Sequence, residues 1–264
     1  MRVDEESSSR DPPGLSPGSR NGWSGWYQIA KRVFDILLSL FGLGLSLPVW
    51  LIVSASVAVE TGWPILFSQQ RVGRGGRSFD SLKFRSMRQD AEAGVGPVQA
   101  SPQDNRVTPF GRVLRSLALD ELPQLLNILK GEMSFVGPRA LRPMEIEAGD
   151  DRARNVSEYE GFEERCTVEP GLTGVAQLLL PRDISREVKF RYDLWYVRNC
   201  TFLLDLHLIV MSLVISARGH WETSGRTMAL IEPLRARVTW DLERQFGRDK
   251  PKRPVRKAAG TKVG

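Results

Sequence analysis

An uncharged, apolar stretch near the N-terminus constrains this chain more than any other feature. Ile36–Val59 comprises 24 residues without a single charged side chain. As a helix it would be about 36 Å long, which is enough to span a bilayer. Lys31 and Arg32 precede it directly, as the positive-inside rule expects of a cytoplasmic flank. We therefore expect a membrane-bound helix here.

Pro48 lies at the middle of this stretch, two residues after Ser46. Because proline has no N–H, it removes a helical hydrogen bond and bends the helix. Each half, about 12 residues and about 18 Å long, reaches only the middle of a bilayer. The segment can therefore enter and return on the same face, or cross as a kinked transmembrane helix. Spacing alone favours the kinked transmembrane helix.

The residues before the stretch and the composition limit the class of protein. Residues 1–25 are rich in Ser, Pro and Gly, so they predict a disordered tail, and without an apolar core they are not a signal peptide. Two cysteines exclude a disulfide framework, and two histidines exclude a His-rich metal site. A net charge of +6 suits an anionic partner such as phosphate or a membrane surface.

The pattern after the apolar stretch predicts an α+β, mostly helical fold with a small β-hairpin. Ile65–Val72 and Ser78–Ser86 read as its two strands, joined by a Gly-rich turn. Residues 94–109 read as a loop. The expected helices are Phe110–Leu117, Glu121–Lys130 (ended by Gly131), Ser185–Asn199 and Phe202–Ala217.

Two C-terminal segments suit a membrane surface. Phe202–Ala217 is apolar but too short to span a bilayer, so we expect it to be buried or to lie at the membrane interface as an amphipathic helix. Residues 222–264 form a basic extension with 11 basic and 5 acidic residues. Its last part, Lys250–Lys262, has no acid and reads as a polybasic tail for anionic lipid. A solvated tail without a partner fits equally well.

Asp120 and Glu121 form the first candidate for chemistry. They precede leucines at helical spacing, with Pro123 acceptable only in a first helical turn. A helix N-terminus favours an anion, so we expect this position to keep Asp120 ionised. One carboxylate could attack while the other holds a metal. The alternative is that Asp120 is simply an N-cap.

Basic side chains form the second candidate. Strand alternation places Lys83 and Arg85 on one face of the second strand, where they could clamp a phosphate or simply be solvated. Phe135–Arg139 reads as a rigid turn that presents Arg139. The glycines of Pro170–Gly174 allow close approach to a ligand, or merely a tight turn. The sequence has no P-loop, Rossmann or nucleophile-elbow pattern.

Together these motifs resemble the bacterial sugar transferase family, the monotopic polyprenyl-phosphate phosphoglycosyl transferases of short form. The resemblance runs from about Lys31 to about Trp221. Each motif is weak alone, but the set follows the family's order. The motifs are Lys31-Arg32-Val33-Phe34-Asp35, Lys83-Phe84-Arg85-Ser86-Met87, Arg106-Val107-Thr108-Pro109-Phe110-Gly111-Arg112, Leu119-Asp120-Glu121-Leu122-Pro123-Gln124-Leu125, Ser134-Phe135-Val136-Gly137-Pro138-Arg139 and Pro170-Gly171-Leu172-Thr173-Gly174.

The resemblance implies a fold and a reaction. Ser46 and Pro48 match the break of a re-entrant membrane helix, which reverses the preference for a kinked span. Asp120 would attack the β-phosphate of a UDP-sugar, release UMP and pass the phosphosugar to polyprenyl (undecaprenyl) phosphate. Asp120 and Glu121 would hold Mg²⁺. The residues that would bind substrate phosphates are Lys83, Arg85, Arg112, Arg139 and Arg182, the last in place of the arginine of a family Gly-Arg motif.

The resemblance also implies a location, partners and a domain division. We expect a re-entrant helix over residues 26–62 and a catalytic domain over residues 63–221 on the cytoplasmic face of the bacterial inner membrane. The partners would be the UDP-sugar, the polyprenyl phosphate and membrane lipids but no nucleic acid, and downstream glycosyltransferases and a homo-oligomer remain open. The reaction would begin a surface glycan such as an exopolysaccharide. The alternatives are a non-catalytic basic scaffold that binds anionic lipid, and a glycoside hydrolase with two carboxylates, which adjacent residues fit poorly.

Overall fold

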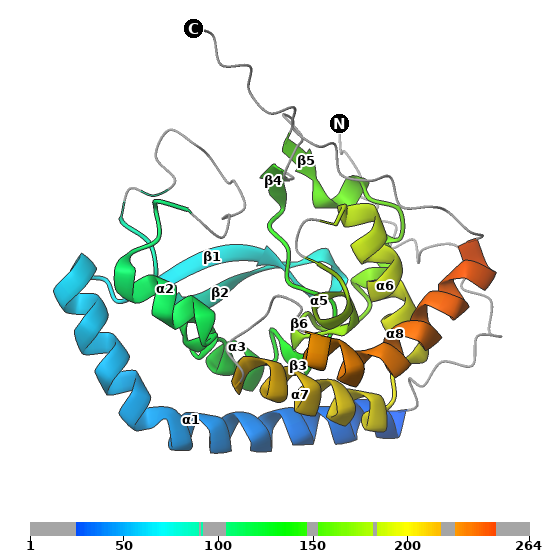
Figure 1. The fold of residues 1–264 in the computed structure, drawn as a ribbon, viewed down its shortest axis with the longest axis horizontal. Helices are drawn as coiled ribbons and strands as arrows, with labels where there is room; N and C mark the ends of the chain where they lie inside the picture. The colour runs from blue at the N-terminus through cyan, green and yellow to red at the C-terminus, as the bar shows by residue number, and fades with distance from the viewer. Residues whose placement is uncertain are drawn as a thin grey trace, which may run out of the picture.

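One long helix, α1 (Gly25–Thr61), runs along one side of the protein and bends midway (Figure 1). The computed structural model describes residues 25–89, 91, 104–146, 153–181, 184–217 and 225–246. With 37 residues α1 is about 56 Å long. It is long and apolar enough to cross a membrane. The polar tail expected over residues 1–25 lies outside the described residues, except for Gly25, which begins α1.

The bend has a local cause in the sequence. Pro48 lies inside α1 and cannot donate a helical hydrogen bond. Ser46 is buried, and its hydroxyl donates to the carbonyl oxygen of Leu43 at 3.3 Å. The two limbs on either side of the bend both pack against the rest of the protein, through Asp35 and Ser39 in the first limb and Val53 in the second. The Ser/Pro site therefore lets one helix follow a curved surface.

The predicted β-hairpin is confirmed. Strands β1 (Leu66–Val72) and β2 (Ser78–Phe84) pair antiparallel, with a single 3-10 turn, η1 (Arg74–Gly76), between them. Phe84 is buried against the second limb of α1 and stacks edge-on against Trp50, with ring centroids 4.9 Å apart. The hairpin is thus fixed to the membrane-type helix at one end.

The main core lies between helices from the second half of the chain. It joins α5 (Val175–Leu179), α6 (Arg186–Asn199), α7 (Phe202–Ala217) and α8 (Gly225–Phe246). Two of these helices match the predicted ranges, but α8 was expected only as part of a basic extension. It contributes Ile231, Leu234, Val238 and Leu242 to the core. The polybasic segment Lys250–Lys262 lies outside the described residues.

Short strands connect the hairpin side to the helical side. β3 (Ser134–Val136) pairs in parallel with β6 (Gly171–Thr173). The expected turn over Phe135–Arg139 is therefore partly wrong, because its first two residues belong to a strand. The other described elements are α2 (Pro109–Ser116), η2 (Leu119–Glu121), α3 (Gln124–Lys130), β4 (Met144–Ile146), β5 (Ala153–Asn155), η3 (Val156–Glu158) and α4 (Phe162–Arg165).

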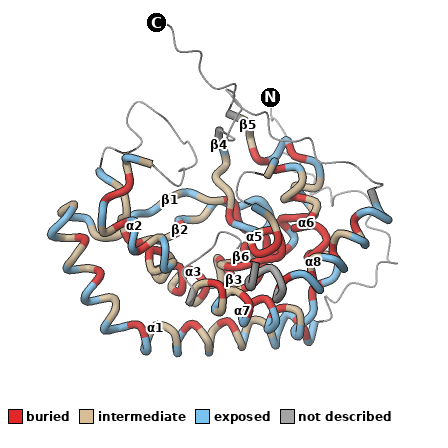
Figure 2. Tube along the Cα trace, in the orientation of Figure 1, coloured by how far each residue is buried: buried red, intermediate tan, exposed pale blue. Residues whose placement is uncertain are grey.

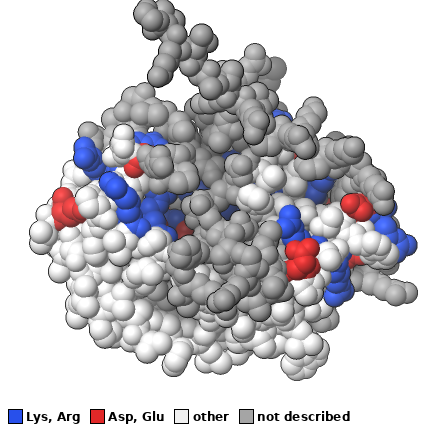
Figure 3. Space-filling model, viewed as in Figure 1, with Lys and Arg blue, Asp and Glu red and all other residues white. Residues whose placement is uncertain are grey.

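The outer faces of α1 and α7 expose large apolar side chains to the same side of the molecule. Leu45 and Leu51 of α1 are 70% and 74% exposed, and Leu203 and Leu213 of α7 are 77% and 64% exposed. Figure 2 shows exposed positions along the lower edge of α1, and in Figure 3 the described residues along this edge are white, that is, neither basic nor acidic. An apolar surface of this extent marks a membrane or protein contact.

Candidate active site

Asp120 and Glu121 lie in the 3-10 turn η2, between α2 and α3. Ala118 precedes the turn with φ of 56°, a left-handed conformation that redirects the chain as it leaves α2. The turn leads into α3, whose N-cap is Pro123 rather than either acid. The pair is therefore at the start of a helical segment, as expected, but Asp120 is not an N-cap.

Positive charges surround the carboxylate of Glu121. The ammonium group of Lys83, on β2, donates a hydrogen bond to Glu121 Oε1. Burial raises the pKa of Glu121, but the charges of Lys83, Arg139 and Arg71 outweigh it and lower this pKa to about 2. Glu121 is consequently ionised at any working pH.

Asp120 experiences the opposite effect. Its side chain is buried, and this burial raises its pKa, with a further increase from the neighbouring charge of Glu121. Lys83 and Arg115 act against this increase without cancelling it. The helix start therefore does not lower the pKa of Asp120 below its ordinary value in the protein without substrate, because desolvation by burial dominates there.

A narrow cavity opens beside Glu121, where four parts of the fold meet. Lys83 and Glu121 face Arg139, which follows β3 and is exposed. The cavity is lined by Arg71, Lys83, Glu121, Gln124, Arg139, Ala140, Gly171 and Leu172. Three arginine and lysine side chains against one carboxylate give this cavity a surplus of positive charge.

The backbone around Arg139 is held from both sides. Arg165, 3% exposed, donates from Nη2 to the carbonyl oxygen of Arg139 and from Nε to Asp193 Oδ2 at 2.8 Å. Arg71 Nη1 donates to the carbonyl oxygen of Ala140 at 3.1 Å. These bonds fix the segment that presents Arg139 to the cavity.

The glycines of two sequence motifs explain how β3 and β6 approach each other. A Cβ on Gly171 would lie 2.1 Å from the backbone nitrogen of Gly137, and one on Gly137 would lie 2.4 Å from the carbonyl oxygen of Glu169. Neither position can hold a larger residue without moving backbone. The Pro170–Gly174 glycines therefore serve contact between two backbone segments, and Gly171 also reaches the cavity.

Some predicted phosphate-binding residues lie outside this cavity. Arg85 follows β2, and its Nη1 is buried without a hydrogen-bond partner in the part of the chain that the structure describes. Arg112 is exposed on α2, and it is Arg115, one turn later, whose charge acts on Asp120. Arg182 lies outside the described residues.

Sequence reasoning missed three residues of the site. Arg71 lies on the first predicted strand of the hairpin, where the sequence analysis gave it no role, and its place in the cavity follows from the folding of that strand. Arg115 could have been considered together with Arg112, because it lies three residues later and residues three apart are neighbours on a helix surface. Gln124 is buried and lines the cavity; it belongs to the Leu119–Leu125 motif, but the sequence analysis gave it no role of its own.

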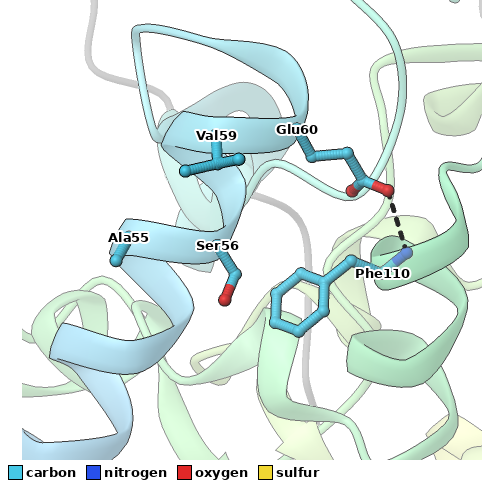
Figure 4. A pocket seen from close by; sticks show the side chains of 5 residues that line it. All are labelled: Ala55, Ser56, Val59, Glu60 and Phe110. Atoms are coloured by element: carbon cyan, nitrogen blue, oxygen red, sulfur yellow. Dashed lines mark hydrogen bonds between the residues drawn. The ribbon is translucent and has the colours of Figure 1, made fainter.

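A second, larger groove lies between α1 and α2 (Figure 4). Glu60 accepts a hydrogen bond from the backbone nitrogen of Phe110 at 3.0 Å and thereby caps the first turn of α2. The groove is lined by Ala55, Ser56, Val59, Glu60 and Phe110. None of the predicted site residues contributes to it, so the charged cavity is the better candidate for chemistry.

The two acids are compatible with Mg²⁺ but do not form a complete protein cage. Within the described ranges, no three or more His, Cys, Asp or Glu side chains are grouped so that they could hold a metal ion by themselves. Mg²⁺ typically binds through one or two carboxylates together with substrate phosphates and water. Asp120 and Glu121 fit that donor set, with a phosphorylated substrate supplying the remaining oxygens.

Comparison with known proteins supports the same family as the motifs. The family model described as bacterial sugar transferase matches residues 26–219. The undecaprenyl-phosphate glucose phosphotransferase of Komagataeibacter xylinus is 37% identical over 209 residues, which is 76% of this chain and 38% of that protein.

Two further relatives differ in name and in length. A UDP-N-acetylgalactosamine-undecaprenyl-phosphate N-acetylgalactosaminephosphotransferase of Aeromonas hydrophila is 35% identical over 191 residues, 71% of this chain and 43% of that protein. The exopolysaccharide production protein ExoY of Rhizobium meliloti is 36% identical over 209 residues, 73% of this chain and 88% of that protein. The chain thus spans about two fifths of the two named phosphotransferases and most of the third relative. The family predicted from the motifs is confirmed: this chain belongs to the bacterial sugar transferase family.

Proposed function

We propose that the protein transfers a sugar 1-phosphate from a UDP-sugar to polyprenyl phosphate at the cytoplasmic face of a bacterial inner membrane. The observation that carries this proposal is the cavity in which Lys83, Arg71 and Arg139 surround Glu121, with Asp120 beside it. Clustered cations beside a carboxylate suit a diphosphate substrate. The names of two relatives contain undecaprenyl phosphate as acceptor, one with glucose and one with N-acetylgalactosamine. We leave the sugar open for this chain.

The reaction proceeds in two displacements at one phosphorus atom. An Asp120 carboxylate oxygen attacks the β-phosphorus of the UDP-sugar, the bond from that phosphorus to the UMP oxygen breaks, and UMP leaves with the electron pair. The acyl phosphate on Asp120 then carries the sugar. A phosphate oxygen of polyprenyl phosphate attacks the same phosphorus, which frees Asp120 as a carboxylate and gives polyprenyl diphosphate-sugar.

The cations of the cavity balance the charge of the diphosphate. In the structure Lys83 is bound to Glu121, while Arg139 is exposed and free of that ion pair. Lys83, Arg71 and Arg139 contact phosphate oxygens, while the charges of Lys83 and Arg115 favour ionised Asp120 over its protonated form. Asp120 and Glu121 would hold Mg²⁺, which would supply further neutralisation of the charge on the diphosphate.

We further propose that α1 enters and leaves the membrane on the same side. Both limbs pack against the same domain, through Asp35 in the first limb and Val57 in the second, while the opposite face is apolar and exposed. A cysteine placed at the exposed Trp63, just after α1, should react only with reagents that reach the cytoplasm. Its labelling from the periplasmic side would contradict this topology and support a kinked span.

Substitution of the nucleophile tests the reaction. Full-length Asp120→Asn in detergent, with Mg²⁺, undecaprenyl phosphate and a panel of UDP-sugars, should lose UMP release by about 10³-fold or more. Because Asp120 is buried with a raised pKa, the neutral amide should leave the fold intact. Asp241→Asn, on α8, is the matched control and should retain activity. UMP release by Asp120→Asn at the wild-type rate would refute the assignment.

The alternative of a non-catalytic scaffold has no support from the relatives. Two of them are named as phosphotransferases. The place of the reaction in glycan assembly is also a proposal. A relative that matches over 88% of its own length is named for exopolysaccharide production. We therefore expect the lipid-linked product to be extended into a surface polysaccharide.

A further inference from the structure

The inner face of the first limb of α1 is polar, although the helix as a whole is apolar. Positions three or four residues apart lie on one face of a helix, and six such positions face the rest of the protein. Lys31 pairs with Asp205 of α7 at 2.7 Å, so it does not act as a free flanking charge. The six positions are Tyr27, Lys31, Asp35, Ser39, Gly42 and Ser46.

Arg32, next to this stripe, binds the C-terminal end of α3. Its two terminal nitrogens donate to the carbonyl oxygens of Ile128 and Leu129 at 2.6 and 2.7 Å. The last carbonyls of a helix have no partner within the helix, and a cation there also interacts favourably with the helix dipole. Gly131 has φ of 90°, and a Cβ there would lie 3.3 Å from Arg32 Nη2, so glycine also leaves room for the guanidinium.

Asp35 binds the other segment that leads to the site. Asp35 is 4% exposed, and its Oδ1 accepts a hydrogen bond from the backbone nitrogen of Phe135 at 3.1 Å. Phe135 lies in β3, four residues before Arg139. A buried carboxyl bonded to one strand amide fixes that strand relative to α1.

Arg32 and Asp35 contact two different segments of the chain, and each segment carries a residue that lines the cavity. α3, which Arg32 binds, begins three residues after Glu121 and carries the cavity residue Gln124. β3, which Asp35 binds, leads to Arg139. Arg32 and Asp35 are one helical turn apart, so a single rigid turn of α1 holds both segments.

We propose that Arg32 and Asp35 are positioning residues, through which the membrane helix sets the distance between the Asp120–Glu121 pair and Arg139. This inference rests on the proposed function and adds to it a role for the Lys31–Asp35 motif. A shift of one of these segments changes the fit of the diphosphate in the transition state more than its initial binding. The cost therefore falls on kcat rather than on KM.

The test compares kcat and KM for UMP release among full-length variants in lipid nanodiscs. Arg32→Ala, which loses both carbonyl contacts, should lower kcat at least tenfold while KM for the UDP-sugar changes less than threefold. Asp35→Leu, which removes the acceptor, should behave alike, whereas Asp35→Asn keeps Oδ1 and should stay within threefold of wild type. Arg244→Ala, at an exposed position of α8, is the matched control and should not change kcat.

Each outcome decides between the proposals. If the wild-type chain releases no UMP from any donor, the proposed function fails. If the wild type is active and both Arg32→Ala and Asp35→Leu keep kcat within twofold, only the positioning role fails. If Arg32→Ala does not fold, Arg32→Lys carries the test, since one ammonium cannot satisfy both carbonyls as the fork does. A kcat for Arg32→Lys lowered at least threefold supports the inference, and a kcat unchanged overturns it.

Discussion

Two carboxylates of this protein each accept a lysine ammonium, but their surroundings differ. Asp205, on α7, is 4% exposed and has both oxygens occupied. Oδ2 accepts from Tyr27 at 2.8 Å and from Lys31 at 2.7 Å, and Oδ1 accepts from Tyr196 at 2.7 Å. One positive charge balances one negative charge, and every donor comes from a packed helix.

Glu121 is held differently. Its side chain is 22% exposed, it lines an open cavity, and the charges of Arg71 and Arg139 act on it in addition to that of Lys83. The cavity thus holds more positive than negative side chains. An anion that enters it can neutralise the remaining positive charge. The contrast teaches that a saturated, balanced ion pair joins helices, whereas an outnumbered carboxylate marks a place where a phosphorylated ligand fits.

Loss of the Asp205 carboxylate should have the largest effect on stability. Asp205→Ala removes the acceptor that the half-buried Lys31 ammonium shares with the hydroxyls of Tyr27 and Tyr196, at a cost of about 3–5 kcal/mol. Urea unfolding in detergent, followed by tryptophan fluorescence, measures the change. A loss under about 1 kcal/mol would mean that this cluster does not join α1 to α7 as the geometry indicates.

The acid limb of the pH profile separates the two site carboxylates. Burial raises the pKa of Asp120, so protonation should remove the nucleophile at a pH above the ordinary range of an aspartate. Glu121, with its pKa lowered to about 2, remains ionised throughout that limb. The profile of kcat/KM for UMP release, corrected for inactivation, measures the limb. A limb at or below about pH 3.9, the unperturbed value for aspartate, would show that desolvation does not control Asp120.

The same two pKa shifts determine how the stability of the fold changes with pH. The raised pKa of Asp120 means that the folded state binds its proton more tightly than the unfolded chain, so ionisation of Asp120 costs stability once the pH exceeds the unfolded value. The lowered pKa of Glu121 contributes stability above its unfolded value, which is lost as the pH falls toward about 2. The ionisation of these two neighbouring residues therefore changes the stability of the fold in opposite directions.

Local patterns predicted much of the fold. The hairpin and α7 were found because strand alternation, turn glycines and a mostly apolar run are local properties. α8 was missed because Arg235, Arg237 and Arg244 made the segment read as a basic extension, although its buried residues recur at helical spacing. A net charge count conceals such an apolar face.

The site was predictable in part. Resemblance identified Lys83, Glu121 and Arg139, which the structure brings to one cavity. The environment of Asp120 was not predictable, because its burial results from contacts made by segments distant in sequence. The same applies to Arg165, whose bond to the backbone of Arg139 depends on how α4 packs on α6.

A third ion pair supplies the smallest expected effect and sharpens the contrast. Arg74 and Glu169 are joined at 2.8 Å, but their side chains are 51% and 28% exposed. Water screens such a pair, so Arg74→Ala should cost about 0–1 kcal/mol in urea unfolding and leave UMP release unchanged. Salt should weaken even this contribution, whereas the Asp205 cluster should be insensitive to salt. A loss of stability as large as that of Asp205→Ala would contradict this prediction. It would show that the exposure of the side chains does not separate the Arg74–Glu169 pair from the Asp205 cluster.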